Sequence, residues 1–300
     1  MIFIITIERL NSANVGTYDS LLFDLFIKEI NISSTEIIAF GAKYNNIPCG
    51  AILAEIRNDN IKECYIKSFV VSPILREKGV GSKLLEGLKN EVTNLKVKKV
   101  IFEAITSKEN IDLLNNFLIK RGFKEAELLT VVYRFTPELL IKENKFIRLV
   151  TSSTFKLPDK VSILPFYKVK DDLIKKVKEK QGINYPDKLS PFANEFNLKE
   201  ECTRFAVFDD KEIIAWMTGF KAPGDIILYR SLFVREDYRK SALGYFIFSE
   251  CIKNHKKNYM DKKGLCAIAL DNDVAIKFVS LYFNNMYDHK KYEFRIEMNL

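Results

Sequence analysis

Histidine and paired cysteine are scarce in this sequence. The 300 residues contain two histidines, His255 and His289, and five cysteines. Both histidines lie among lysines and no two cysteines form a C-x-x-C pair, so the ligand spacing of a zinc site is lacking and we expect no metal. An odd number of unpaired cysteines is typical of reduced, buried thiols, which favours a cytoplasmic protein. No histidine lies near Cys64 in the sequence, which argues against a catalytic thiol there.

Long apolar runs are also lacking. No stretch reaches the length that spans a bilayer, and residues 1–7 are followed too soon by Glu8 and Arg9 for a signal peptide. We therefore expect a first strand there and no membrane partner. The single tryptophan, Trp216, is predicted to lie in the core rather than to form a ligand platform.

The charge is basic but scattered. The formal net charge is +8 and the pI is about 9.0. A basic balance can indicate nucleic acid binding, but the lysines lie on helices that also carry an apolar stripe, as at 171–180. Such runs are typical of solvated helix faces, so we predict no nucleic acid partner. A modest positive field also suits a cofactor that carries several phosphates.

Residues 64–94 have the order expected of a phosphate cradle. A β-branched and aromatic run at 65–71 ends before Pro73, and Gly79 and Gly81 precede an amphipathic helix. Glycines let backbone N–H groups converge at the helix N-terminus, where unpaired donors and the helix dipole attract phosphate. Arg76 and Lys78 add positive charge. The alternative is an ordinary strand-to-helix turn whose glycines serve only the turn.

The same order recurs in the second half. Residues 231–234 repeat the pattern of residues 68–71, and Arg239 follows 163 positions after Arg76. Each copy continues through a helix to a further strand and helix, where Asn110 and Asn272 lie at nearly equal distances from their arginines. The period is that of a whole domain, not of a short solenoid repeat.

Both halves resemble GNAT superfamily N-acetyltransferase domains, and the chain resembles the tandem kind exemplified by mycothiol synthase. The resemblance implies a mixed sheet whose fourth and fifth strands splay apart, with acetyl-CoA held in the gap. The strand after residue 68 would pair with the pantetheine arm, and the R-x-x-G-x-G loop would hold the pyrophosphate. The implied cofactor-binding residues are Phe69, Val70, Val71, Arg76, Glu77, Lys78, Gly79, Val80, Gly81, Ser82 and Asn110.

The sequence departs from the family pattern in both halves. Leu118, and Val279 in the second half, stand where many members carry the tyrosine that protonates the leaving thiolate. Ala242 replaces the first glycine of the second loop, although Asn272-x-x-Ala275 matches the family better than the first half does. We therefore expect the first half to bind acetyl-CoA productively, and the second to bind it weakly or to shape the acceptor pocket.

Acyl transfer to an amine needs a base, an oxyanion donor and a proton for the leaving sulfur. Strand alternation predicts that Glu63, Tyr65, Lys67 and Phe69 share one face, which makes Glu63 the candidate base and Tyr65 the candidate hydroxyl. A bulge in this strand would free a backbone N–H for the oxyanion. A solvent-facing carboxylate at a strand edge is the alternative for Glu63.

The pattern of elements predicts an α/β fold with a mixed α+β sheet in each of two tandem GNAT domains. In the first half we expect strands at 1–10, 36–44, 49–57, 62–71 and 99–105, helices at 17–31, 79–94 and 109–121, and strand material to about 135. Periodicity is lost over 137–159, so the predicted domains are 1–145, with the intact loop, and 146–300, with the degenerate loop.

These features predict an acetyl-CoA-dependent N-acetyltransferase, monomeric or homodimeric, that acts on a primary amine. A small-molecule acceptor is favoured because a second domain would close off a pocket. The alternatives are a protein or peptide N-acetyltransferase, which would need an open groove, an aminoacyl-transferase-like protein, and a noncatalytic CoA-binding protein. The intact loop at 76–81 argues against a protein that no longer uses CoA.

Overall fold

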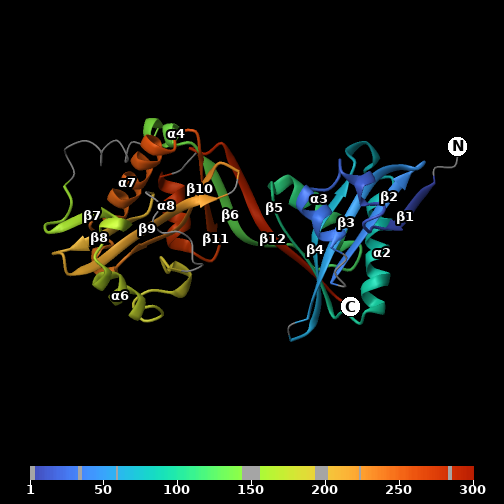
Figure 1. The fold of residues 1–300 in the computed structure, drawn as a ribbon, viewed down its shortest axis with the longest axis horizontal. Coiled ribbons are helices and arrows are strands. Elements are labelled where there is room, and N and C mark those ends of the chain that lie inside the picture. The colour runs from blue at the N-terminus through green and yellow to red at the C-terminus, as the bar shows by residue number, and fades with distance from the viewer. Residues whose placement is uncertain are drawn as a thin grey trace. The chain divides into compact units, whose positions relative to one another are not determined.

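The chain forms two compact units in the computed structural model, which describes residues 4–32, 36–58, 60–143, 156–192, 202–222, 224–282 and 286–300 (Figure 1). Unit 1 comprises residues 1–129 and 292–300, and unit 2 comprises residues 130–291. This division differs from the halves 1–145 and 146–300 expected from sequence. The difference arises because each half gives its last strand to the sheet of the other unit.

Unit 1 is a mixed sheet with helices on both faces. Its strand order is β1-β2-β3-β4-β5-β12, and among these described strands only β4 and β5 pair in parallel. Its strands and helices are β1 (Ile5–Arg9), α1 (Asp24–Asn31), β2 (Ile37–Tyr44), β3 (Ile47–Asn58), β4 (Lys62–Val71), α2 (Val80–Asn94), β5 (Lys99–Thr106), α3 (Lys108–Ile119) and β12 (His289–Asn299).

Two apolar clusters define the faces of the unit 1 sheet. On one face α2 and α3 pack their apolar stripes, including Leu84 and Leu118, against strand residues such as Ile66. On the other face, α1 and the preceding 3-10 turn (Val15–Tyr18) pack against Leu53 and its neighbours. Burial on both faces explains why the middle of β3, residues 49–54, reads as a continuous apolar run.

Unit 2 repeats this architecture. Its strand order is β6-β11-β10-β9-β8-β7, with β10 and β11 as the parallel pair. Its strands and helices are β6 (Glu127–Phe135), α4 (Pro137–Glu143), β7 (Val161–Pro165), α6 (Asp171–Glu179), β8 (Arg204–Phe208), β9 (Glu212–Ala222), β10 (Ile226–Val234), α7 (Leu243–Asn258), β11 (Lys263–Ala269) and α8 (Asp273–Tyr282).

Residues of β9 show which helix covers each face of the unit 2 sheet. Trp216 is buried beside Phe233 and the apolar stripe of α6, as the sequence predicted for the only tryptophan. Gly219, three positions along the same strand, pairs with Tyr229, whose hydroxyl contacts His255 of α7. Positions three apart on a strand face opposite sides, so α6 and α7 cover opposite faces.

The exchange of strands is visible in Figure 1, where β12, drawn red, lies beside β5 of unit 1. The β5–β12 pairing runs from Thr106 opposite Tyr292 to Lys99 opposite Asn299. In unit 2, β6 pairs with β11 from Phe135 opposite Gly264 to Thr130 opposite Ala269. A strand from the other half of the sequence therefore pairs with β5 in unit 1 and with β11 in unit 2. Neither β5 nor β11 is an edge strand.

Candidate functional site

The loop that the sequence predicts to be a phosphate cradle lies at the start of α2. β4 ends at Val71, a 3-10 turn follows at Pro73–Leu75, and α2 begins at Val80. Gly79 precedes the helix with φ +86°, a left-handed conformation that favours glycine. The Lys83 N–H donates the first helical hydrogen bond, to Gly79 O at 3.1 Å. The N–H groups that precede it in the first turn therefore point out of the end of the helix.

The residues around this turn suit an anionic group. Arg76, Glu77, Lys78 and Gly79 are exposed, Val80 is buried, and Gly81 and Ser82 are partly buried. The Arg76 Nε donates to Val71 O at 3.4 Å, which holds its guanidinium beside the loop. N–H donors at a helix N-terminus beside a fixed cation form a favourable environment for phosphate.

Arg121, which follows α3, also contacts this loop, although the sequence analysis did not identify it as a site residue. Its guanidinium lies 3.8 Å from the centre of the Phe117 ring and donates to Ser82 Oγ at 2.5 Å and Phe117 O at 2.7 Å. Arg121 is 39 positions from Ser82, and only the folding of α3 beside α2 brings them together. An arginine after an aromatic residue near a helix end was the only available signal.

β4 and β5 separate next to the cradle, as the resemblance implied. Their parallel pairing covers only four positions and ends where Ile66 faces Phe102. The β3–β4 register shifts between Ile66 and Ser68, which leaves Lys67 as a bulged residue at the same point. The predicted bulge is therefore confirmed, although it lies just before residues 68–71. Bulges bend a strand and disturb its ladder, and this one lies where the gap opens.

The bulge overturns one expectation about side-chain direction. Glu63, Tyr65 and Phe69 do not share a face, because one extra residue reverses the alternation after Ile66. Phe69 packs with α2 and α3, with ring centres 5.8 Å from Phe117 and 6.5 Å from Phe102. Val70 packs with the α1 cluster instead. Val71 returns to the face of α2 and α3.

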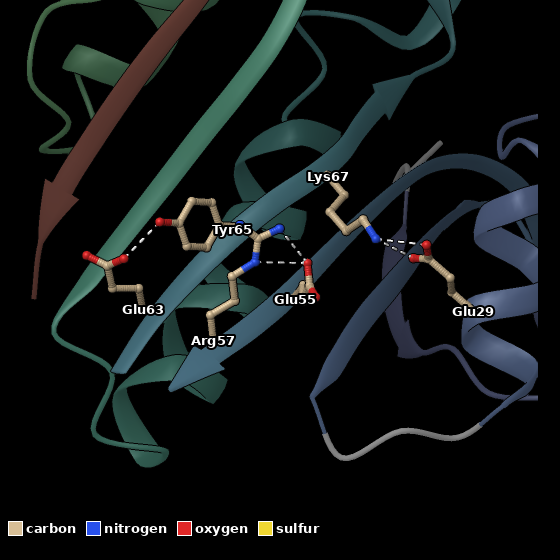
Figure 2. A network of polar contacts seen from close by, with 6 residues as sticks. All are labelled: Glu29, Glu55, Arg57, Glu63, Tyr65 and Lys67. Carbon is tan, nitrogen blue, oxygen red and sulfur yellow. Dashed lines mark hydrogen bonds and ion pairs between the residues drawn. The ribbon is translucent and has the colours of Figure 1, made fainter. Parts of the chain in front are cut away.

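Glu63 and Tyr65 form a polar network on the other side of β4 (Figure 2). The Tyr65 hydroxyl donates to Glu63 Oε2 at 2.8 Å, and the Arg57 guanidinium lies 4.2 Å from the Tyr65 ring centre. Arg57 in turn donates to Glu55. Burial, followed by the hydrogen bond to Glu63, raises the pKa of Tyr65 above its usual value. The two candidate catalytic groups are thus hydrogen-bonded to each other.

The bulged residue carries a separate ion pair. Lys67 Nζ donates to both carboxylate oxygens of Glu29, on α1, at 2.8 Å (Figure 2). Both side chains are about one quarter exposed, at 26% and 23%. The gap between β4 and β5 is therefore flanked by a bidentate ion pair of opposite charges on the face away from α2.

Asn110 and Leu118 lie on α3 in different environments. Asn110 is exposed in the first turn, where its Nδ2 donates to Thr106 Oγ1 at 3.0 Å. Ser107, rather than Asn110, is the N-cap of α3, whereas Asn272 accepts from Ala275 N–H at the start of α8. Asn110 thus lies inside the first turn of α3, whereas Asn272 caps the start of α8. Leu118 is fully buried in the core.

Unit 2 repeats the loop geometry despite its altered sequence. Arg239 Nε donates to Val234 O at 3.3 Å, as Arg76 does to Val71 O, and Arg230 is the bulged residue that corresponds to Lys67. Ala242 occupies the position of Gly79 with φ +58°, a conformation that costs a non-glycine residue roughly 1–2 kcal/mol. The duplication therefore preserves backbone geometry even where the glycine is lost.

The similarity to known proteins agrees with this geometry. A model of the acetyltransferase (GNAT) family matches residues 6–123 and 171–282, which together make up most of the sequence. The chain belongs to the GNAT acetyltransferase family. Both matched segments include a parallel strand pair and the loop that follows it, so the family assignment and the internal duplication coincide. No curated protein matches the sequence significantly.

Solved structures extend the similarity to the tandem arrangement. A tandem GNAT protein from the clavulanic acid biosynthesis pathway aligns with a TM-score of 0.59 at 11% identity over 98% of each chain. A GCN5-related N-acetyltransferase from Sphaerobacter thermophilus aligns with a TM-score of 0.60 at 11% identity, over 99% of this GNAT chain and 96% of that one. At such identities the alignments establish a shared fold only.

Two further findings concern partners and metals. Within the described ranges, no helix has the length and apolar character needed to cross a membrane. In the same part of the chain, His, Cys, Asp and Glu side chains do not gather in groups of three or more that could hold a metal ion.

Proposed function

We propose that this GNAT protein is an N-acetyltransferase that transfers the acetyl group of acetyl-CoA to a primary amine of a small molecule, and that the cofactor binds in unit 1. One observation carries the proposal: a first helical turn with outward N–H groups, a left-handed Gly79 and a fixed Arg76 lies beside the point where β4 and β5 separate. Family membership supports the chemistry, and the residues present fit a phosphate-bearing thioester.

The proposed roles follow from this placement. Residues 76–82 hold the pyrophosphate, with Arg121 held on Ser82 as an additional cation. The unpaired edge of β4 after Ile66 offers backbone groups to an extended ligand. When bound, acetyl-CoA supplies an activated acetyl thioester, and the disturbed ladder at the bulge offers an N–H donor for the oxyanion.

Glu63 and Tyr65 are the proposed proton-transfer groups. Glu63 accepts a proton from the incoming ammonium, and Tyr65 supplies one to the leaving sulfur, directly or through water. Both lie on the face away from α2, at the end of β4 that remains paired with β5, so an amine would approach from that face. Leu118 is buried and apolar, so it cannot replace the usual tyrosine.

The test compares matched loop variants in a thiol-release assay over a panel of small amines and peptides. A Cβ on Gly81 would lie 3.3 Å from the rings of Phe69 and Phe117, so Gly81→Val is expected to displace the first turn of α2 and reduce kcat/KM for acetyl-CoA at least tenfold. Gly244→Val meets only an ordinary contact with Val234 at 3.4 Å, and should change turnover less than threefold.

The reverse ranking would place the reaction in unit 2. Circular dichroism and melting curves of both variants establish that each remains folded. Turnover of peptides in place of small amines would refute the proposed acceptor class. If acetyl-CoA raises the melting temperature but no amine is acetylated, the noncatalytic alternative is preferred.

A further inference from the structure

Arg57, near the end of β3, holds a guanidinium beside the proposed proton-transfer groups (Figure 2). Its Nε and Nη2 donate to one carboxylate oxygen of Glu55, at 3.2 and 2.9 Å, and its guanidinium carbon lies 4.2 Å from the ring centre of Tyr65. The ion pair and the aromatic ring together fix the orientation of this cation. The Arg57 side chain is nevertheless 48% exposed, so a ligand can reach it.

Glu55 uses only one edge of this guanidinium. A guanidinium carries five N–H donors in a rigid, planar fork. Within the described part of the chain, the hydrogen bonds of Arg57 are those of Nε and Nη2 to Glu55, so the edge between Nη1 and Nη2 retains donors for a second acceptor group. Two parallel N–H groups on such an edge match the two oxygens of a carboxylate. Arg57 is therefore suited to bind an anionic group.

The carboxylate proposed to receive the amine proton lies next to the same tyrosine. The Tyr65 hydroxyl donates to Glu63 Oε2 at 2.8 Å, and Arg57 lies over the ring that carries this hydroxyl. A site for an ammonium and a site for an anion are thus separated by about the width of an aromatic ring. Both charges can belong to the same small molecule, with a short chain between them.

The other charged pairs of this face argue against an acceptor with several ammonium groups. Lys67 pairs with Glu29. Glu103 of β5 and Arg295 of β12 lie opposite each other on the face that carries Tyr65, and they also form an ion pair. A second ammonium would therefore meet carboxylates that already have a cation, or the cations themselves, and like charges brought together are unfavourable.

We propose that the acceptor is an amine that also carries a carboxylate, and that Arg57 binds this carboxylate while Glu63 and Tyr65 act on the amine. The inference rests on the proposed acetyltransfer in unit 1 and narrows its acceptor class to amino acids and related zwitterions. Arg57 contacts the remote end of the acceptor and transfers no proton. Its loss should therefore raise KM for such acceptors and change kcat little.

The experiment compares acceptors that differ only at the end remote from the amine. Thiol release by the full-length protein is measured with glycine, β-alanine and γ-aminobutyrate. The best of these is then compared with analogues in which a carboxamide, a methyl, a phosphonate or an aminomethyl group replaces the carboxylate. We expect kcat/KM for the carboxylate to exceed that for the carboxamide and methyl analogues at least roughly tenfold, because hydrogen bonds to charged groups are strong.

Arg9 offers a matched control for Arg57. It also belongs to unit 1 and lies over an aromatic ring, 5.3 Å from the centre of Phe40, and its side chain pairs with Glu91 and is 40% exposed. Arg57→Gln should raise KM for the carboxylate acceptor at least roughly tenfold but leave KM for the methyl analogue within about twofold, whereas Arg9→Gln should change neither. Arg57→Lys keeps the charge without the planar fork and should restore only part of the affinity.

Arginine labelling supplies a measurement that does not require turnover. The protein is treated with phenylglyoxal in the presence of CoA, which cannot donate an acetyl group, and modified peptides are quantified by mass spectrometry. The carboxylate acceptor should slow the labelling of Arg57 relative to that of Arg9. The methyl analogue should not slow it, because it has no group that occupies the open edge of the guanidinium.

Several outcomes would overturn the inference. They are equal kcat/KM for the carboxylate, carboxamide and methyl analogues, preference for the phosphonate or the diamine, equal effects of Arg57→Gln and Arg9→Gln, and labelling of Arg57 that the carboxylate acceptor does not slow. Amine turnover without a carboxylate preference would leave the acetyltransfer supported and refute only the acceptor class. Protection of Arg57 without turnover of any amine would support the carboxylate site and refute the transfer reaction, so the two failures are distinguishable.

Discussion

At the scale of single residues, the proposed chemistry depends on a hydroxyl and a carboxylate that are already paired. Tyr65 donates to Glu63, and Lys99 Nζ lies 4.0 Å from the other carboxylate oxygen. A proton accepted by Glu63 can therefore be shared with the phenolic oxygen along an existing hydrogen bond. Burial is the first cause of the raised pKa of Tyr65, and this pairing adds to it, since ionisation would place two negative charges together.

Glu63→Gln keeps the shape of the side chain but cannot accept the proton, and Tyr65→Phe removes only the hydroxyl. Each change should lower kcat for a confirmed acceptor by roughly 10² to 10⁴, the usual contribution of general acid or base catalysis. Rates within a few fold of the parent between about pH 6 and 9 in both variants would show that positioning and the backbone donor suffice.

A matched pair on the same face controls for a general loss of charge. Arg57 and Glu55 belong to the same polar network but are not proposed to transfer protons. Glu55→Gln should therefore change kcat only slightly. An equal loss in Glu55→Gln and Glu63→Gln would indicate an electrostatic rather than a proton-transfer role.

At the scale of elements, a buried histidine connects β10 to α7. His255 is fully buried; its Nε2 lies 3.1 Å from Lys262 O, which requires the proton on Nε2 and leaves Nδ1 to accept from Tyr229. Burial lowers the pKa of His255 below its ordinary value of 6.5. Folded unit 2 thus holds a neutral imidazole that the unfolded chain would protonate.

The sign of the pH dependence follows. A depressed pKa means that the unfolded state binds more protons, so stability is fully present above about pH 6.5 and is lost as the pH falls below it. Urea unfolding followed by Trp216 emission should show unit 2 losing up to about 1.4 kcal/mol between pH 7.5 and pH 5.5 from this group.

His255→Gln removes the titrating group and should flatten this pH dependence, whereas Tyr229→Phe keeps the buried imidazole and should retain it. The same slope in His255→Gln as in the parent would assign the effect to other groups.

The elements of the core site were predictable because local signals were strong. The sequence predicted a strand at 62–71 and a helix at 79–94, and the structure has β4 at Lys62–Val71 and α2 at Val80–Asn94. Pro73 follows the strand and Gly79 precedes the helix, and the apolar spacing changes between the two segments. Asn45 and Asn46, both with positive φ, likewise form a turn from residue types that favour chain reversal.

Tertiary contacts decided the features that the sequence did not predict. The helix expected at 17–31 is a 3-10 turn and the shorter α1, because Tyr18 packs its ring into the space that Gly41 leaves open and donates to Glu8. The bulge at Lys67 reverses a face through a register with β3 that local sequence does not encode. Arg121 acquires its role only through α3 packing beside α2.

At the scale of the whole molecule, the exchanged strands make each unit depend on both halves of the sequence. Phe294, on β12, is fully buried in unit 1, where its ring centre lies 5.7 Å from Phe102. Phe135, on β6, is fully buried in unit 2 and stacks on Tyr229 at 5.8 Å. Pairing partners that lie so far apart in sequence leave no local signal, so division of the chain at the aperiodic segment gave different boundaries.

Truncation of these two rings tests the exchange. A buried Phe→Ala change typically costs about 3–5 kcal/mol. Phe294→Ala, near the end of the chain, should lower the hydrogen-exchange protection of β4 and β5 in unit 1 while the Trp216 unfolding midpoint stays in place. Phe135→Ala, in the first half, should shift the Trp216 midpoint and leave the protection of β4 and β5 intact. Without strand exchange, each substitution would destabilise the unit of its own half, so Phe294→Ala would shift the Trp216 midpoint and Phe135→Ala would expose β4 and β5.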